Sequence, residues 1–361
     1  MKNTDNPKNY SKMVKNTKIL ISVIFLSLVS VFSLSTCIAL LLSNAATKRQ
    51  ADASQSELDA LESEGYYTTA QAQQLMDQAV SEAMKQAGDE LRNEFRKRLE
   101  AGDKLGAIRS IFPDDIVTEY AGQYFFKPID PNVARNPFSP EDFVVGDDGS
   151  ISYAGMDANI LVTRGIDVSR SQGDIDFNKV KEAGIDFVMI RAGLRGSAEG
   201  QLLEDDYFKT NFAKAQKAGL EVGVYFYSQA IDTTEAAEEA QFVIDLLNGA
   251  DITYPIAIDL EQISSSEART SKLSPQLYSE IANAFCQKID EAGYRPMIQG
   301  GIRTFSELLD IEDLQKYPVW IVYHGFPQYY PYEFGMWQYS KSGHIDGIEG
   351  DVSMDIYIGT K

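Results

Sequence analysis

Two acidic residues, separated by one position, follow a short apolar run. The run covers residues 255–258, and Asp259 and Glu261 come directly after it. Residues two apart in a β-strand share a face, so the two carboxyl groups would project together, about 6.6 Å apart along the strand. Acids this close repel each other when both are ionised, so one keeps its proton towards neutral pH, as glycosidic cleavage requires. A helix-capping Asp followed by a solvated Glu is the alternative interpretation.

Polar and aromatic residues also stand at the ends of other predicted strands. They are Asp167, Arg191, Tyr225, Tyr227, Gln299 and Trp337. Aromatic rings stack on sugar rings, while carboxylates and amides bind hydroxyl and acetamido groups. Each residue alone could instead belong to a turn or to the core. Together they predict a carbohydrate site, because the carboxyl ends of the strands of a β/α barrel meet at one opening.

The elements that would position these residues alternate along the second half of the chain. Helical stretches end at Gly184, Gly219 and Gly293, which suit the left-handed position after a helix. Short apolar runs predict eight strands, at 165–168, 187–191, 222–227, 255–260, 297–300, 319–323, 336–339 and 352–358. This alternation predicts an α/β fold, a compact, irregular, TIM-like (β/α) barrel over residues 161–361, smaller than the usual ~250 residues.

The N-terminal region has the pattern of a membrane anchor. Residues 19–42 are apolar and uncharged, and residues 1–18 are rich in lysine. Their length and the positive-inside rule predict a cytoplasmic tail at 1–18, a transmembrane helix at 19–42 and an extracellular remainder at the cell membrane. The alternative is a cleavable signal peptide with a small-residue site at 43–45, which would give a secreted protein.

A tether and helical stalk are predicted at residues 43–105. Residues 50–67 are polar and suggest a flexible tether, and a capping-box pattern at Thr68 predicts a helix with an apolar stripe from Ala72 to Leu99. The stripe would either self-associate as a coiled coil, or belong to a helix that packs on the domain or stands as a lone solvated stalk. Its many alanines argue against the coiled coil. Residues 106–160 read as a connector with a small β segment at 124–126.

Composition narrows the possible chemistry. The chain has 361 residues, 44% of them hydrophobic, which is enough for a sizeable core, and a formal net charge of -20, which argues against nucleic acid as a partner. Cys37 and Cys286 are not expected to pair. His324 and His344 do not have the spacing of a zinc motif, and no G-x-S-x-G motif is present. We therefore expect neither a metal nor a cofactor.

Several motifs in order resemble family 25 of the glycoside hydrolases. They are GIDVS at 165–169 with QGDIDF at 172–177, FVMIRAG at 187–193, GLEVGVYFYS at 219–228, IDLE at 258–261, and WQYS at 337–340 with GIEG at 347–350. The resemblance covers residue 165 to the end of the chain. It implies a muramidase that cleaves the β-1,4 bond between N-acetylmuramic acid and N-acetylglucosamine in the glycan strands of peptidoglycan.

The resemblance also implies roles for the acids. Glu261 would be the general acid, Asp259 would orient and polarise the 2-acetamido group, and Asp167 would position substrate or water. Two departures stand out: Phe226 replaces a histidine of many members, which suggests altered contacts at the barrel mouth. Ser353 replaces an acid that Asp355 could supply. A non-catalytic wall-binding scaffold and cleavage of a chitin-like polymer remain alternatives.

Overall fold

The computed structural model describes residues 45–63, 69–120, 122–261, 263 and 265–360, together with residues 20, 23, 24, 26–30 and 33. Contacts divide the chain into two units, Met1–Val117 and Thr118–Lys361. Most of the predicted membrane segment at 19–42, and the cytoplasmic tail before it, lie outside the described residues. Among the described residues, no helix combines the length and apolar character that a bilayer crossing needs.

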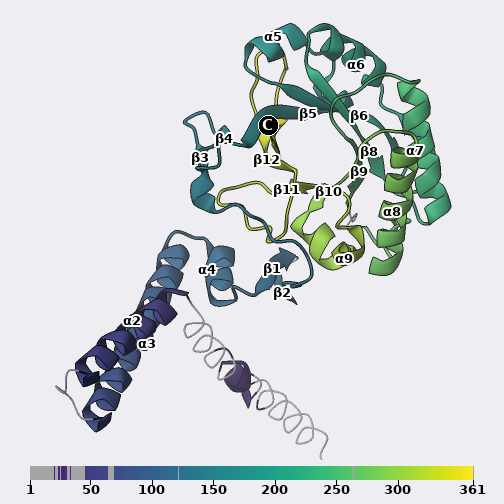
Figure 1. Cartoon of the computed structure of the whole chain (residues 1–361). Coiled ribbons are helices and arrows are strands. Elements are labelled where there is room, and N and C mark those ends of the chain that lie inside the picture. The colour runs from purple at the N-terminus through teal and green to yellow at the C-terminus, as the bar shows by residue number, and fades with distance from the viewer. Residues whose placement is uncertain are drawn as a thin grey trace, which may run out of the picture. The chain divides into compact units, whose positions relative to one another are not determined.

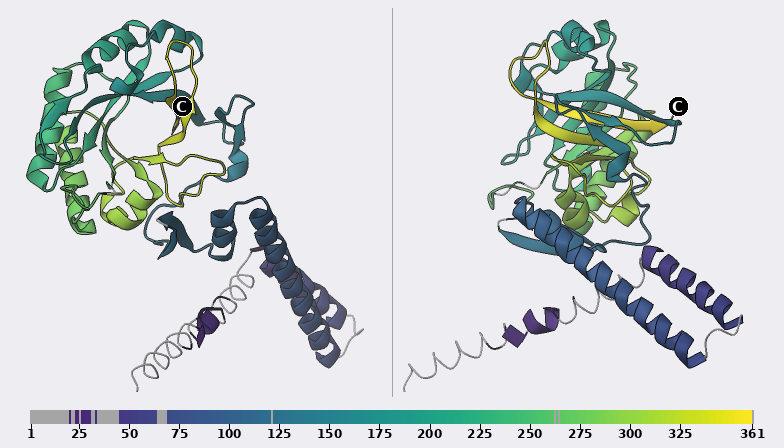
Figure 2. Two further views of the ribbon diagram at one scale, coloured as in Figure 1. Left: turned by 180° about the vertical axis from the view of Figure 1, so that it is seen from behind. Right: turned by 90° about the vertical axis from the view of Figure 1, so that its left-hand side faces the viewer.

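The first unit is built from three helices, α2 (Ala45–Ser63), α3 (Thr69–Glu100) and α4 (Lys104–Ile111). The predicted helix after Thr68 is confirmed as α3, but the predicted tether is wrong, since α2 is helical through most of it. Alanine, glutamine and glutamate favour a helix, and Gln55 donates to Asp59 one turn later at 2.6 Å. Helices α2 and α3 lie side by side (Figure 2), and Met76 and Val80 of the apolar stripe face α2 residues across a cavity of about 270 Å³. Part of the stripe thus packs against a neighbouring helix, which none of the interpretations specified, and self-association stays a prediction.

The second unit contains the predicted barrel. Eight strands form its closed ring in the described part of the chain, with the order β5-β13-β12-β11-β10-β9-β8-β6 and a further pairing of β6 with β5. Their bounds are β5 Ile160–Val168, β6 Phe187–Arg195, β8 Glu221–Ser228, β9 Ile256–Leu260, β10 Pro296–Gly301, β11 Val319–Val322, β12 Met336–Gly343 and β13 Val352–Thr360. All eight match predicted strands. Neighbours from β5 to β12 run parallel, but β13 is antiparallel to both β12 and β5, which departs from a ring of parallel units.

Helices surround the ring (Figure 1). They are α5 (Phe177–Glu182), α6 (Phe208–Lys217), α7 (Thr233–Leu247), α8 (Pro275–Glu291) and α9 (Ile311–Leu314). Helix α8 begins where the Ser274 hydroxyl accepts from the Leu277 amide and Pro275 occupies the first turn. Gly184, Gly219 and Gly293 end their helical segments with positive φ angles, as predicted.

The barrel interior has an apolar layer below a polar one. Phe187, Met189, Tyr225, Ala257, Met297, Trp320 and Met336 form one buried cluster. Phe187 stacks on Tyr254 with ring centroids 4.3 Å apart. A Cβ on Gly165 would come within 2.1 Å of the Phe187 ring, so a glycine is needed there. The next inward positions, towards the carboxyl ends of the strands, are polar, and they carry the candidate site.

Segments before the barrel complete the second unit. β1 (Asp115–Tyr120) and β2 (Gln123–Pro128) pair with each other, and so do β3 (Phe143–Val145) and β4 (Ile151–Tyr153). The predicted β segment at 124–126 is confirmed as part of β2. Phe143 packs edge-on against Trp337 with centroids 6.0 Å apart. Residues 118–160 of the predicted connector therefore group with the barrel.

Candidate active site

The D-x-E pair lies at the carboxyl end of β9, with Asp259 on its inner face and Glu261 directly after its last residue. Ala257 belongs to the interior cluster, and Asp259 follows it two residues later on the same face. Burial raises the pKa of Asp259 well above its usual value, and the charges of Glu261 and Asp167 raise it further. Glu261 lies more exposed at the rim, where desolvation raises its pKa and the charge of His324 opposes that rise. The three acids Asp259, Glu261 and Asp167 therefore lie close enough for their charges to interact.

Asp167 enters the same cluster from β5. Its Oδ2 accepts a hydrogen bond from Gln338 Nε2 at 2.6 Å. Burial raises the pKa of Asp167 to about 6, against the lowering effect of hydrogen bonds from Gln338, Asp355 and Ser353. Ser353 lies directly opposite Asp167 in the β13–β5 ladder, so the residue that departs from the family pattern contacts this acid.

Asp355 lies beneath Asp167 and is completely buried. Its Oδ1 accepts a hydrogen bond from Trp320 Nε1 at 2.9 Å, and its Oδ2 has no hydrogen-bond partner among the described residues. Burial raises the pKa of Asp355 well above its usual value, and the Asp167 charge adds to this rise. Two buried carboxyls in contact are stable when they share a proton. Because Asp355 has no exposed surface, it acts on the site through Asp167, not by touching substrate.

The predicted binding residues Arg191, Tyr225, Tyr227 and Gln299 lie around these acids. Arg191 is held by Asp205, whose Oδ2 accepts from Nη2 at 2.7 Å and from Nε at 2.8 Å. Burial raises the pKa of both tyrosines; Asp167 adds most to the rise for Tyr225, and Glu261 adds most for Tyr227. Gln299 pairs with Asp259 across the ladder. It is only 4% exposed, and its Oε1 is buried without a partner in the described structure.

Two expectations about aromatic residues are wrong. Trp337 lies on the outer face of β12, fully buried between Phe143 and Tyr339, with Nε1 donating to the Tyr323 carbonyl at 2.7 Å. It cannot contact a substrate in the barrel mouth. Phe226 is also fully buried and packs against Phe242 of α7, so it does not alter contacts at the mouth. In both cases the neighbouring residue in the strand faces inward.

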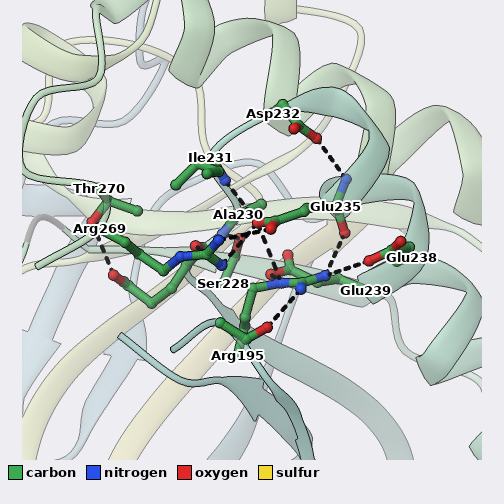
Figure 3. Close-up of polar contacts among 12 residues, drawn as sticks. Arg195, Ser228, Ala230, Ile231, Asp232, Glu235, Glu238, Glu239, Arg269 and Thr270 are labelled. Carbon is green, nitrogen blue, oxygen red and sulfur yellow. Dashed lines mark hydrogen bonds and ion pairs between the residues drawn. The ribbon is translucent and has the colours of Figure 1, made fainter. Parts of the chain in front are cut away.

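A charged network anchors the segments beside the site (Figure 3). Arg195, at the end of β6 and 4% exposed, donates to Glu239 Oε1 at 2.8 Å, to the Gly200 carbonyl at 2.8 Å and to the Glu235 carbonyl at 3.0 Å. Glu235 in turn receives two hydrogen bonds from Arg269, at 2.7 and 2.9 Å. These contacts join β6, α7 and the segment that follows β9.

The same network reaches the backbone of the catalytic candidate. Gln229, directly after β8, donates to the Glu261 carbonyl at 3.4 Å and accepts from the Thr270 hydroxyl at 2.9 Å. Arg269 adds a hydrogen bond to the Gln229 carbonyl at 3.3 Å. Glu261 and Thr270 are thereby both tied to Gln229, which helps to hold the Glu261 backbone in place.

Sequence reasoning missed Gln338, Ser353 and His324 as residues of the site. His324 lies after β11, and its Nε2 is 2.8 Å from Gln338 Oε1. Strand alternation could have identified Gln338, since Met336 of the interior cluster is two residues before it on the same face. Nothing in the spacing of His324 points to Gln338 or Asp167, because that contact arises only when the ring closes.

The arrangement suits acid–base chemistry on a sugar. Asp259 and Asp167 are buried carboxyls whose pKa values are raised, and Glu261 stands at the rim where a substrate oxygen can approach. A carboxyl that keeps its proton near neutral pH can protonate a leaving group. A neighbouring group that carries negative charge can then stabilise the oxocarbenium-like transition state.

Known proteins share this barrel. Residues 166–348 match the model of the family described as glycosyl hydrolases family 25. An autolytic lysozyme from Clostridium acetobutylicum is 29% identical over 195 residues, which cover 53% of this chain and 55% of that protein. Lysozyme M1 from Streptomyces globisporus is 28% identical over 213 residues, which cover 55% of this chain and 68% of that protein. The chain thus spans little more than half of the autolytic lysozyme.

One solved structure supports the fold alone. The modular autolysin LytC from Streptococcus pneumoniae aligns with a TM-score of 0.50 and 23% sequence identity, over 68% of this chain and 58% of that one. A second structure of LytC is a complex with a synthetic peptidoglycan ligand. At this identity the likeness confirms a shared barrel, and the chemistry of the present chain must be argued from its own residues.

Proposed function

Because this chain belongs to glycosyl hydrolases family 25, we propose that it hydrolyses peptidoglycan as a muramidase, at the β-1,4 bond between N-acetylmuramic acid and N-acetylglucosamine. The observation that carries the proposal is the convergence of Asp167, Asp259 and Glu261 at one barrel mouth, with the pKa of each carboxyl raised. The autolytic and lysozyme relatives add support for a wall polymer as substrate.

In the proposed mechanism, Glu261 donates a proton to the glycosidic oxygen as the bond breaks. Asp259, next to it on β9, orients and polarises the 2-acetamido group, whose oxygen can attack the anomeric carbon. Asp167 positions substrate or water from the opposite side. The hydroxyl groups of Tyr225 and Tyr227 are suited to bind polar groups of the sugar.

The test is digestion of purified bacterial peptidoglycan by the protein and by Glu261→Gln. The wild type should release reducing ends, and Glu261→Gln should lower the rate by about 10²- to 10⁴-fold, the usual contribution of a general acid. Glu267→Gln is the matched control, because Glu267 is an exposed glutamate of the same segment. Equal rates for wild type and Glu261→Gln would refute the assignment of Glu261.

The products distinguish the bond. Reduction of the new ends with borohydride should convert muramic acid, and not glucosamine, into its alcohol. Binding to peptidoglycan without any release by the wild type would instead favour the non-catalytic scaffold. Release from chitin oligomers alone would favour the chitin-like substrate.

We also propose that residues 19–42 anchor the protein in the cell membrane with the barrel outside. The support is the lysine-rich segment before an uncharged apolar run. Intact mass of the protein from membranes should include residues 1–42, and protease added to cells without their wall should remove the barrel. A mature protein that begins near Ala45 would instead identify a cleaved signal.

A further inference from the structure

His324 is a histidine beside the site to which the proposed mechanism gives no role. It follows β11 by two residues and is exposed. Its backbone position is set by its neighbour Tyr323, whose amide donates to the Gln338 carbonyl at 3.1 Å and whose carbonyl accepts from Trp337 Nε1 at 2.7 Å. The imidazole is therefore attached to a well-anchored part of the rim.

A chain of hydrogen bonds links this ring to Asp167. His324 Nε2 is 2.8 Å from Gln338 Oε1, and Gln338 Nε2 donates to Asp167 Oδ2 at 2.6 Å. The NH₂ group of the Gln338 side chain must face an ionised Asp167, because a carboxylate only accepts hydrogen bonds. The carbonyl oxygen of Gln338 then faces His324, and that oxygen also only accepts. Nε2 of His324 must therefore carry the hydrogen, and the ring fixes the carboxamide that orients Asp167.

The charge of His324 acts on two carboxyl groups of the site. A positive imidazole stabilises the ionised forms of both Asp167 and Glu261. The titratable groups that line or underlie the mouth are Asp167 from β5, Arg191 from β6, Tyr225 and Tyr227 from β8, Asp259 and Glu261 from β9, and Asp355 from β13. Of these, Arg191 is already bound to Asp205, which leaves His324 to compensate charge on the Glu261 side.

We propose that His324 is a positioning and charge-compensating residue of the catalytic centre, which orients Asp167 through Gln338 and stabilises Glu261 after it has given up its proton. This inference rests on the proposed muramidase function. It assigns His324 two separable effects: a hydrogen bond that sets geometry and a charge that sets the acid strength of Glu261. A glutamine can replace the first effect, since its amide can donate, but not the second.

The experiment measures reducing-end release from purified peptidoglycan as a function of pH, with the full chain. His324→Ala should lower kcat about tenfold with little change in KM, because Asp167 loses its orientation. His324→Gln should retain kcat within about threefold. Both variants should move the basic limb of the pH profile upward by about half a unit or more, since loss of a nearby positive charge raises the pKa of a carboxyl.

His344→Gln is the matched control, because His344 is the other histidine and its side chain is 78% exposed. It should leave the rates and the pH profile unchanged. If wild type is active and His324→Gln keeps the wild-type basic limb, the inference is overturned while the muramidase proposal stands. If wild type releases no reducing ends, the proposed function fails instead. If circular dichroism shows that His324→Ala does not fold, the basic limb of the pH profile of His324→Gln alone tests the inference.

Discussion

Replacing Arg195 by methionine tests how the charged network supports the barrel. Arg195 is 4% exposed and Glu239 is fully buried, and their contact is 2.8 Å long. Arg195 also donates hydrogen bonds to the carbonyls of Gly200 and Glu235. Removing one partner of a buried ion pair leaves the other charge without compensation and typically lowers the free energy of unfolding by about 3–5 kcal/mol. For a unit of this size that corresponds to a fall in Tm of about 6–20 °C.

The loss should depend on pH. Burial already raises the pKa of Glu239 to about 7, against the lowering effect of Arg195. Without Arg195 that pKa rises further, so the folded variant takes up a proton that the unfolded chain releases. A carboxyl whose folded pKa is raised gives stability that is present at low pH and is lost as pH rises through the folded pKa. The difference between Arg195→Met and wild type should therefore stay nearly constant from pH 5 to about pH 7 and grow as the pH rises above 7, where only the wild-type Glu239 ionises.

Tryptophan fluorescence during urea unfolding is the suitable assay, because the two tryptophans, Trp320 and Trp337, are both fully buried in the barrel. The double variant Arg195→Met with Glu239→Leu is the control. It replaces the pair by apolar side chains and should recover at least half of the lost stability. A double variant as unstable as the sum of the two single variants would refute the view that a stranded charge causes the loss.

Three further predictions concern the same unit. Trp320→Phe removes the hydrogen bond to Asp355 and should lower the free energy of unfolding by about 1–3 kcal/mol; an unchanged urea midpoint would contradict this. Gly200→Ala should lower the Tm more than Gly219→Ala in thermal melts. Both glycines have a positive φ, but only at Gly200 would an added Cβ meet another side chain, 2.3 Å from the Arg269 guanidinium. Asp167→Asn should be more stable than wild type at pH 8, by up to about 3 kcal/mol, and this gain should vanish near pH 4, because the pKa of Asp167 is raised to about 6 and its destabilising charge is lost below that pH. A constant difference between the two pH values would exclude that charge as the cause.

The strands and the acid pair were predictable because their signals are local. Each ring strand is a short apolar run that follows a helix or a turn, and Asp259 and Glu261 sit two apart at the end of such a run. The direction of β13 was not predictable in this way, because it depends on pairing with strands distant in the sequence. The helix α2 was missed because its polarity outweighed its helix-forming composition in our interpretation.

Residue roles were harder to predict than elements. In β12 the choice between Trp337 and Gln338 depends on which face of the strand turns inward, and an aromatic residue next to an amide does not decide it. Asp355 was predicted to touch the substrate, but its complete burial beside Asp167 suits an indirect role. The pair of Arg195 and Glu239 joins positions 44 residues apart, and nothing in the spacing of the two indicates that they meet.

The antiparallel strand β13 affects when the barrel and its acid cluster are completed during synthesis. It is the latest of the ring strands in chain order, yet it pairs along its length with β5, the earliest. Pairing between such distant segments forms late, because a long loop must close first. A nascent chain that has already produced β9 with both its acids still lacks the strand that brings Asp355 and Ser353 to Asp167. The proposed lytic activity would then appear only after β13 has left the ribosome and paired with β5.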